Sequence, residues 1–168
     1  MRNTEKPYQR LWPFAGILIL TALAFLPALG YPFTNWDDPI HLTENLSVRS
    51  LNPANLRIIF TESVQKIYIP LTTLSFALEY HFFKYNPFIY HLNNLLLHLA
   101  VTVLVYFIGL RLGFDRWAAA VAALLHGIHP MRVESVAWVT ERKDVLYAFF
   151  YMLSLHQYLG YVEKRERN

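Results

Sequence analysis

The apolar positions of this sequence gather in long blocks, unlike the one-sided periodic stripes of helices in soluble proteins. A helix that crosses a bilayer needs about 20 mainly apolar residues, with about 17 as the lower limit. Three blocks reach that length: residues 12–29, residues 89–110 and residues 145–162. The pattern therefore predicts an all-α membrane protein.

A fourth block, residues 114–128, is harder to assign, because its apolar core from Trp117 to Ile128 is short for a crossing. A re-entrant segment, which returns to the side it came from, is the alternative. Lys and Arg concentrate in short cytoplasmic loops. The basic N-terminus, the turn with Arg111 and Arg116, and the basic tail share one side only if this block crosses. We therefore expect about four transmembrane helices.

Four crossings would divide the chain into a cytoplasmic N-terminus (1–11), a long external segment (30–88), a second external segment (129–144) and a cytoplasmic tail (163–168). The basic residues before the first block also suit a signal peptide, and "PALG" offers small residues for cleavage. The block is long for a signal peptide, so we interpret it as a retained anchor.

The long external segment contains two further helix signals. In "LNPANLRIIFTES", Asn52 suits an N-cap and Pro53 the first helical position. The stretch "PLTTLSFALEYHFFKYNP" is apolar but ends too soon at Lys84 to cross a bilayer. We expect both segments to form helices that lie along the membrane interface.

Composition supports a membrane protein and excludes several other classes. Of the 168 residues, 55% are hydrophobic and 16% aromatic, which is high for a soluble domain. The net charge of +3 comes from residues at block ends, so we expect a lipid bilayer as partner and no nucleic acid. The absence of cysteine excludes disulfides and thiolate metal sites. Nucleotide-binding, nucleophile-elbow and zinc-protease motifs are also absent from the sequence.

Two adjacent acids follow the first block in "NWDDP". Asp38 precedes a proline, so its carboxylate suits the start of a helix. Asp37 has no such task. Neighbouring carboxylates repel each other, and a bound divalent metal would relieve the repulsion between Asp37 and Asp38. A helix cap and a functional site at the membrane exit both remain open.

Three cations lie in the second external segment, against the usual charge bias. They are Arg132, Arg142 and Lys143. An anionic ligand such as a lipid phosphate would compensate for them, since Arg matches phosphate geometry with two hydrogen bonds. Solvated or headgroup contacts are the alternative. In the same segment Glu134 falls in the first turn of a predicted helix after His129, and Asp144 precedes the last block.

The second block carries polar residues on one helical face. His91, Asn94 and His98 are spaced i, i+3 and i+7. Polar groups inside a bilayer usually face a bundle interior or a cavity. Helix packing through hydrogen bonds and a role in catalysis both remain open, and the spacing of the two histidines is poor for zinc.

Three stretches resemble one family: "NWDDP", "IPLTTLSFALEYHFFKYNPFIYHLNNLLLH" and, most specifically, "HPMRVESVAWVTERKDVLYAFFYMLSL". They are similar to the N-terminal membrane region of bacterial multi-span proteins that usually carry tetratricopeptide repeats. The eukaryotic relatives are transmembrane and tetratricopeptide-containing O-mannosyltransferases of the GT-C superfamily. The resemblance implies sugar transfer from a polyprenyl-phosphate-linked donor to an acceptor hydroxyl on the external face.

Within that resemblance, acids of the first external loop activate the acceptor or hold a metal, which points to Asp37 and Asp38. The second segment resembles the family patch around His129, Glu134, Arg142 and Asp144, with Glu134 as a further catalytic candidate. We expect a location in the bacterial inner membrane with the long loop in the periplasm. GT-C enzymes have more spans, so we expect a partial GT-C-like fold that a partner chain completes. A non-catalytic scaffold is the alternative function.

Overall fold

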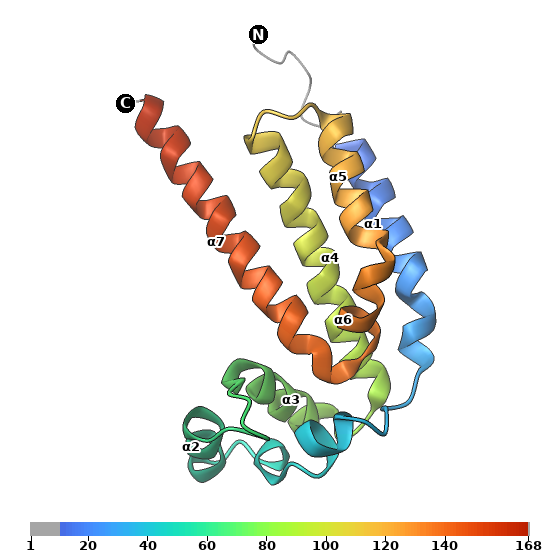
Figure 1. Cartoon of the computed structure of the whole chain (residues 1–168), viewed down its shortest axis with the longest axis vertical. Helices are drawn as coiled ribbons and strands as arrows, with labels where there is room; N and C mark the ends of the chain where they lie inside the picture. Colours follow the sequence, from blue (N-terminus) through green and yellow to red (C-terminus); the bar gives the residue numbers. More distant parts are fainter. Residues whose placement is uncertain (1–10, 168) are drawn as a thin grey trace.

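The computed structural model describes residues 11–167, which are helices joined by short connections. Within this range there is no β-strand, only an isolated bridge between Val64 and Ile67. The predicted all-α class is confirmed. Long helices form a bundle, and shorter ones gather at one of its ends (Figure 1). The bundle consists of α1 (Leu11–Phe25) with its 3₁₀ extension η2 (Leu26–Gly30), α4 (Pro87–Arg111), α5 (Arg116–Ile128) and α7 (Arg142–Arg167).

Helix α4 is the centre of the bundle and packs against α1, α5 and α7. Small residues allow α4 and α5 to come close: a Cβ on Gly109 would lie only 3.1 Å from the Cβ of Ala119. Ile17 of α1 and Tyr106 of α4 close the core around Ala119 and Ala123. Helix α7 meets α4 near its first turns and then leans away from the other helices (Figure 1).

The segment between η2 and α4 folds into a small unit, which we call the head region (residues 31–86). It contains a π-type turn η3 (Pro39–Thr43), the 3₁₀ turn η4 (Leu46–Arg49), α2 (Pro53–Thr61) and α3 (Pro70–Phe83). The side chain of Asn52 accepts a hydrogen bond from the Asn55 amide at 2.8 Å, with Pro53 at the first helical position, as predicted. That α2 and α3 lie along a membrane interface stays a prediction.

A second chain segment reaches the same end of the bundle. The α5–α7 connection (residues 129–141) contains η5 (Pro130–Arg132), α6 (Val133–Ala137) and η6 (Val139–Glu141), and it lies beside the head region (Figure 1). Val139 enters the core of the head region, where Leu42, Val48 and Phe76 surround it. Two segments that are far apart in sequence therefore form one structural unit.

Length and composition single out two helical stretches as candidate membrane spans, Pro13–Gly30 and Pro87–Arg111. Helix α5 is apolar but shorter, and α7 falls outside this group although it has 26 residues. The expected number of four spans therefore stays a prediction. Helix α5 begins at the end of the bundle opposite the head region and runs toward the head region (Figure 1).

Candidate functional site

Asp38 ties the head region to the α5–α7 connection. Its Oδ2 accepts a hydrogen bond from the Thr34 amide at 2.7 Å, and its Oδ1 accepts one from the Thr140 amide at 3.2 Å. The side chain is fully buried. The expected role as a helix cap is wrong, because the carboxylate forms no cap hydrogen bond to η3. Its two oxygens instead accept from the amide of Thr34, which precedes it, and from the amide of Thr140, about a hundred residues later.

Asp37 has a different environment from its neighbour. Its side chain is half-buried and forms no hydrogen bond or ion pair within residues 11–167. The η3 turn places His41 next to it, with the His41 amide donating to the Asp37 carbonyl at 3.0 Å. Asp37 is the strongest charge acting on His41, followed by Lys143. The free carboxylate therefore lies within a cluster to which both segments contribute.

Sequence reasoning missed His41, which is 5% exposed and whose Nδ1 has no hydrogen-bond partner among the described residues. Burial lowers its pKa from the ordinary value of 6.5, and Lys143 lowers it further, while Asp37, Asp38 and Glu141 oppose the shift. The available signal was its position four residues after Asp37, which places both residues on one face of a helical turn.

Lys143 is the cation of this cluster that remains accessible. Its Nζ lies 2.5 Å from the Oε1 of Glu141, and its side chain is 32% exposed. An ammonium group has three donors, so the contact with Glu141 leaves donors for a ligand. Lys143 therefore fits the predicted role in phosphate binding better than a fully engaged cation would.

Arg142 has a very different position, because its guanidinium is buried and surrounded by protein acceptors. Its Nε donates to the Asn94 Oδ1 at 2.7 Å, and its Nη2 donates to the Tyr90 carbonyl at 2.8 Å. Its Nη1 donates to the Ser75 Oγ at 3.0 Å and lies 2.6 Å from the Glu79 Oε2. These contacts join α3, α4 and α7. The structure thus gives Arg142 protein partners in place of the phosphate that the sequence analysis assigned to it.

Glu79 is the anionic partner in this buried network. Burial raises the pKa of its carboxyl group, and the charge and hydrogen bond of Arg142 oppose that rise. Asn93 also donates to Glu79, at 2.5 Å. The face of the Phe76 ring lies 4.6 Å from the centre of the Arg142 guanidinium. Sequence analysis did not single out Glu79, whose significance depends on this contact between α3 and the start of α7.

The polar face of α4 is buried, as expected for polar groups in an apolar helix. Besides accepting from Arg142, Asn94 donates to the Trp138 carbonyl at 3.1 Å. The His98 Nε2 lies 2.8 Å from the Gly127 carbonyl oxygen, which joins α4 to α5. His91 lies near Asp38 and forms no well-aligned hydrogen bond within the described chain. Asn94 and His98 thus make packing contacts between segments.

The remaining candidates lie on the α5–α7 connection and in the first turn of α7. Glu134 is exposed in the first turn of α6, and the His129 Nδ1 accepts from the Met131 amide at 3.2 Å, which caps η5. Arg132 and Asp144 line a cavity of about 20 Å³ together with His98 and His126. Of the three predicted cations, Lys143 therefore lies in the cluster with Asp37. Arg132 lies beside the small cavity, and Arg142 lies in the buried network.

The donor set around Asp37 and Asp38 does not fit a metal centre. Among residues 11–167 no group of three or more His, Cys, Asp and Glu side chains is arranged to hold a metal ion. Both carboxylate oxygens of Asp38 are already used by backbone amides. The chemistry available here is that of an uncompensated carboxylate beside a buried imidazole and an accessible ammonium group.

Comparison with known proteins gives relatives among the protein O-mannosyl-transferases. Protein O-mannosyl-transferase TMTC2 of Mus musculus is 40% identical over 100 residues, which are 60% of this chain and 12% of the relative. The tmtc2 protein of Xenopus laevis is 35% identical over 156 residues, 87% of this chain and 18% of the relative. Protein O-mannosyl-transferase F38B6.6 of Caenorhabditis elegans is 30% identical over 167 residues, 91% of this chain and 24% of the relative.

No family model matches the chain. No solved structure matches it either. The homologues are protein O-mannosyl-transferases, which confirms the resemblance to the eukaryotic enzymes. The chain spans less than a quarter of the length of these curated relatives.

Proposed function

We propose that this chain is a membrane glycosyltransferase module that transfers a sugar from a polyprenyl-phosphate-linked donor to a hydroxyl group of an acceptor polypeptide. The names of its homologues point to mannose as the sugar and protein as the acceptor. The observation that carries the proposal is the hydrogen bond from the Thr140 amide to Asp38, which brings Asp37, His41 and Lys143 into one cluster.

In the proposed reaction Asp37 acts as the general base. Its carboxylate takes the proton from the acceptor hydroxyl as that oxygen forms a bond to the anomeric carbon of the sugar. The bond between this carbon and the phosphate oxygen breaks, and the lipid phosphate leaves with the electron pair. Asp37 suits this task because it is half-buried, without a hydrogen bond or ion pair, and next to a buried imidazole. No step requires a metal ion.

Lys143 has the role of stabilising the departing phosphate. Its partly exposed side chain supplies positive charge where negative charge develops on the phosphate. Arg132 is exposed on the α5–α7 connection and assists the approach of the anionic donor. Arg142 acts as a positioning residue: it fixes the start of α7, from which Lys143 projects.

The proposal also includes an orientation. The end of the bundle with the head region would face the periplasm of a bacterial cell, and α1, α4, α5 and α7 would all cross the inner membrane. The start of α1 and the end of α7 lie at the opposite end of the bundle, which supports an even number of crossings (Figure 1).

A pair of variants tests the role of Asp37. The protein is placed in liposomes with radiolabelled mannosyl-phosphoryl-polyprenol and a Ser/Thr peptide, and transfer to the peptide is counted. We expect Asp37→Asn to lower the rate by at least about 100-fold, as for loss of a general base, with an unchanged melting temperature. Asp38→Asn should instead lower the melting temperature, because Asp38 uses both oxygens to join two segments.

Asp115→Asn is the matched control, because Asp115 caps α5 at the far end of the bundle. It should retain the wild-type rate. Full activity of Asp37→Asn would refute the assignment of the base, and absence of transfer by the wild-type chain would refute the proposed activity.

A further inference from the structure

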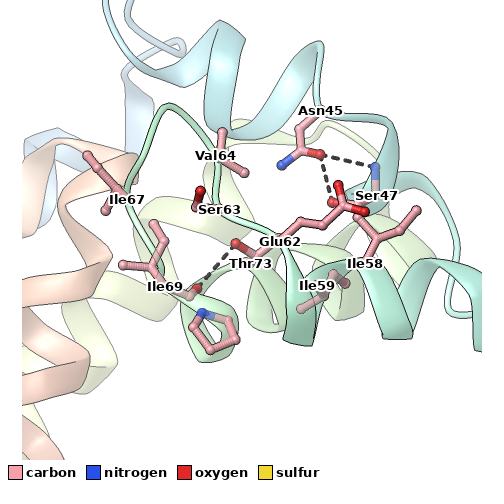
Figure 2. A pocket seen from close by; sticks show the side chains of 11 residues that line it. Asn45, Ser47, Ile58, Ile59, Glu62, Ser63, Val64, Ile67, Ile69 and Thr73 are labelled. Atoms are coloured by element: carbon pink, nitrogen blue, oxygen red, sulfur yellow. Dashed lines mark hydrogen bonds between the residues drawn. The ribbon is translucent and has the colours of Figure 1, made fainter.

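The head region contains a pocket that the proposed reaction does not use (Figure 2). It lies between η4, α2, the start of α3 and the turn that follows α2. Its volume is about 110 Å³, far above the roughly 10–15 Å³ that holds one water, so it can admit a side chain.

The pocket combines apolar walls with two exposed polar side chains. Ile58, Ile59 and Ile67 contribute to the walls. The Glu62 carboxylate and the Ser63 hydroxyl form no hydrogen bond or ion pair within residues 11–167, and Figure 2 shows both side chains at the pocket. A free carboxylate beside branched aliphatic side chains matches a ligand with an aliphatic stem and a cationic end.

Hydrogen bonds of Asn45 connect one wall of this pocket to the candidate site. Asn45 accepts from the Ser47 amide and hydroxyl at 3.0 and 2.7 Å, and its Nδ2 donates to the His41 carbonyl at 3.3 Å. One wall is therefore anchored to the turn that positions His41 beside Asp37. A side chain held in the pocket would bring neighbouring residues of the same peptide toward that turn.

We propose that this pocket binds a lysine or arginine side chain of the acceptor polypeptide, with Glu62 as the anionic partner. The proposal rests on the proposed function, because it presumes a polypeptide acceptor. An acidic side chain is disfavoured by repulsion from Glu62, and a purely apolar one would leave the exposed Glu62 carboxylate without a partner of opposite charge. A lone carboxylate is also too small a donor set for a divalent cation.

Peptide binding can be measured apart from sugar transfer. The probe is a fluorescein-labelled peptide, Ala-Thr-Ser-Ala-Lys-Ala, and its polarisation is followed with the full chain in nanodiscs without donor. Replacing the lysine by norleucine keeps the aliphatic stem and removes the charge. Because Glu62 is exposed and an exposed ion pair contributes little, we expect norleucine or Glu62→Gln to weaken binding by a few-fold, up to about fivefold.

Glu166→Gln is the control, since Glu166 is an exposed carboxylate at the end of α7. It should bind the lysine peptide like wild type, and because no donor is present, this binding is measured separately from sugar transfer. A second variant, Ser63→Met, fills the pocket and should weaken both peptides. Equal binding of lysine and norleucine peptides, unchanged binding by Glu62→Gln, or absence of any peptide binding would each overturn the proposal.

Discussion

Asp37 and Asp38 show how two identical neighbouring residues acquire different roles. The sequence suggested that one of the pair was structural, and the structure identifies it as Asp38, although through contacts other than the predicted cap. The bond to Thr140 depends on how residues about a hundred positions apart meet, so local sequence could not predict it. For the same reason the sequence could not distinguish buried Arg142 from its partly exposed neighbour Lys143.

The buried pair of Arg142 and Glu79 gives a prediction at the residue scale. Arg142→Met removes the cation and leaves a buried carboxylate without its partner, which typically costs about 3–5 kcal/mol. Without Arg142, burial raises the pKa of Glu79 further, because the opposing charge is gone. We expect a marked fall in the melting temperature of Arg142→Met in detergent, and recovery of most of it in the Arg142→Met, Glu79→Gln double variant.

Arg111 provides the comparison for this experiment. It pairs with Glu163 at 2.9 Å between α4 and α7, but both side chains are partly exposed. An exposed pair contributes about 0–1 kcal/mol, so Arg111→Met should change the melting temperature only slightly. A similar loss in both variants would show that burial does not govern the contribution of Arg142.

At the scale of elements, the sequence predicted helices better than their contacts. The Asn52–Pro53 signal located α2, and the apolar blocks located α1, α4, α5 and α7, because caps and apolar runs are local features. The π-type turn η3 was not predicted beyond its proline, since its Leu42 packs into a core formed by residues distant in sequence. That turn determines where His41 lies and hence the electrostatics of the cluster.

The η3 turn should become less stable in acid because of His41. Burial lowers the pKa of this residue below 6.5, so the unfolded turn binds a proton more readily than the folded one. The contribution of His41 to stability is therefore fully present above pH 6.5. It is lost as the pH falls from 6.5 toward the lowered pKa of His41 in the folded turn. We expect hydrogen exchange of residues 39–49, corrected for intrinsic rates, to show weaker protection at pH 5.5 than at pH 7.5.

His41→Gln is the control, because it keeps a polar side chain that does not titrate in this range. The difference in protection between the two pH values should largely disappear in this variant. Protection that is equal at both pH values in the wild type would contradict the prediction.

At the scale of the whole molecule, the decisive feature is the direction in which each bundle helix runs. If α5 crosses, Trp36 and Met131 share one side and Leu112 and Lys164 the other; if α5 is re-entrant, Met131 joins Leu112 and Lys164 changes side. The chain has no cysteine, so single replacements at these exposed positions can be labelled without background. We expect a membrane-impermeant maleimide to label Trp36→Cys and Met131→Cys in intact spheroplasts, and Leu112→Cys and Lys164→Cys only after permeabilisation.

Labelling of Lys164→Cys but not Met131→Cys from outside would establish the re-entrant arrangement. It would also separate Arg132 from the side on which Asp37 lies. Because the proposed reaction needs the head region and the α5–α7 connection in one aqueous compartment, this measurement tests the architecture of the site independently of catalysis.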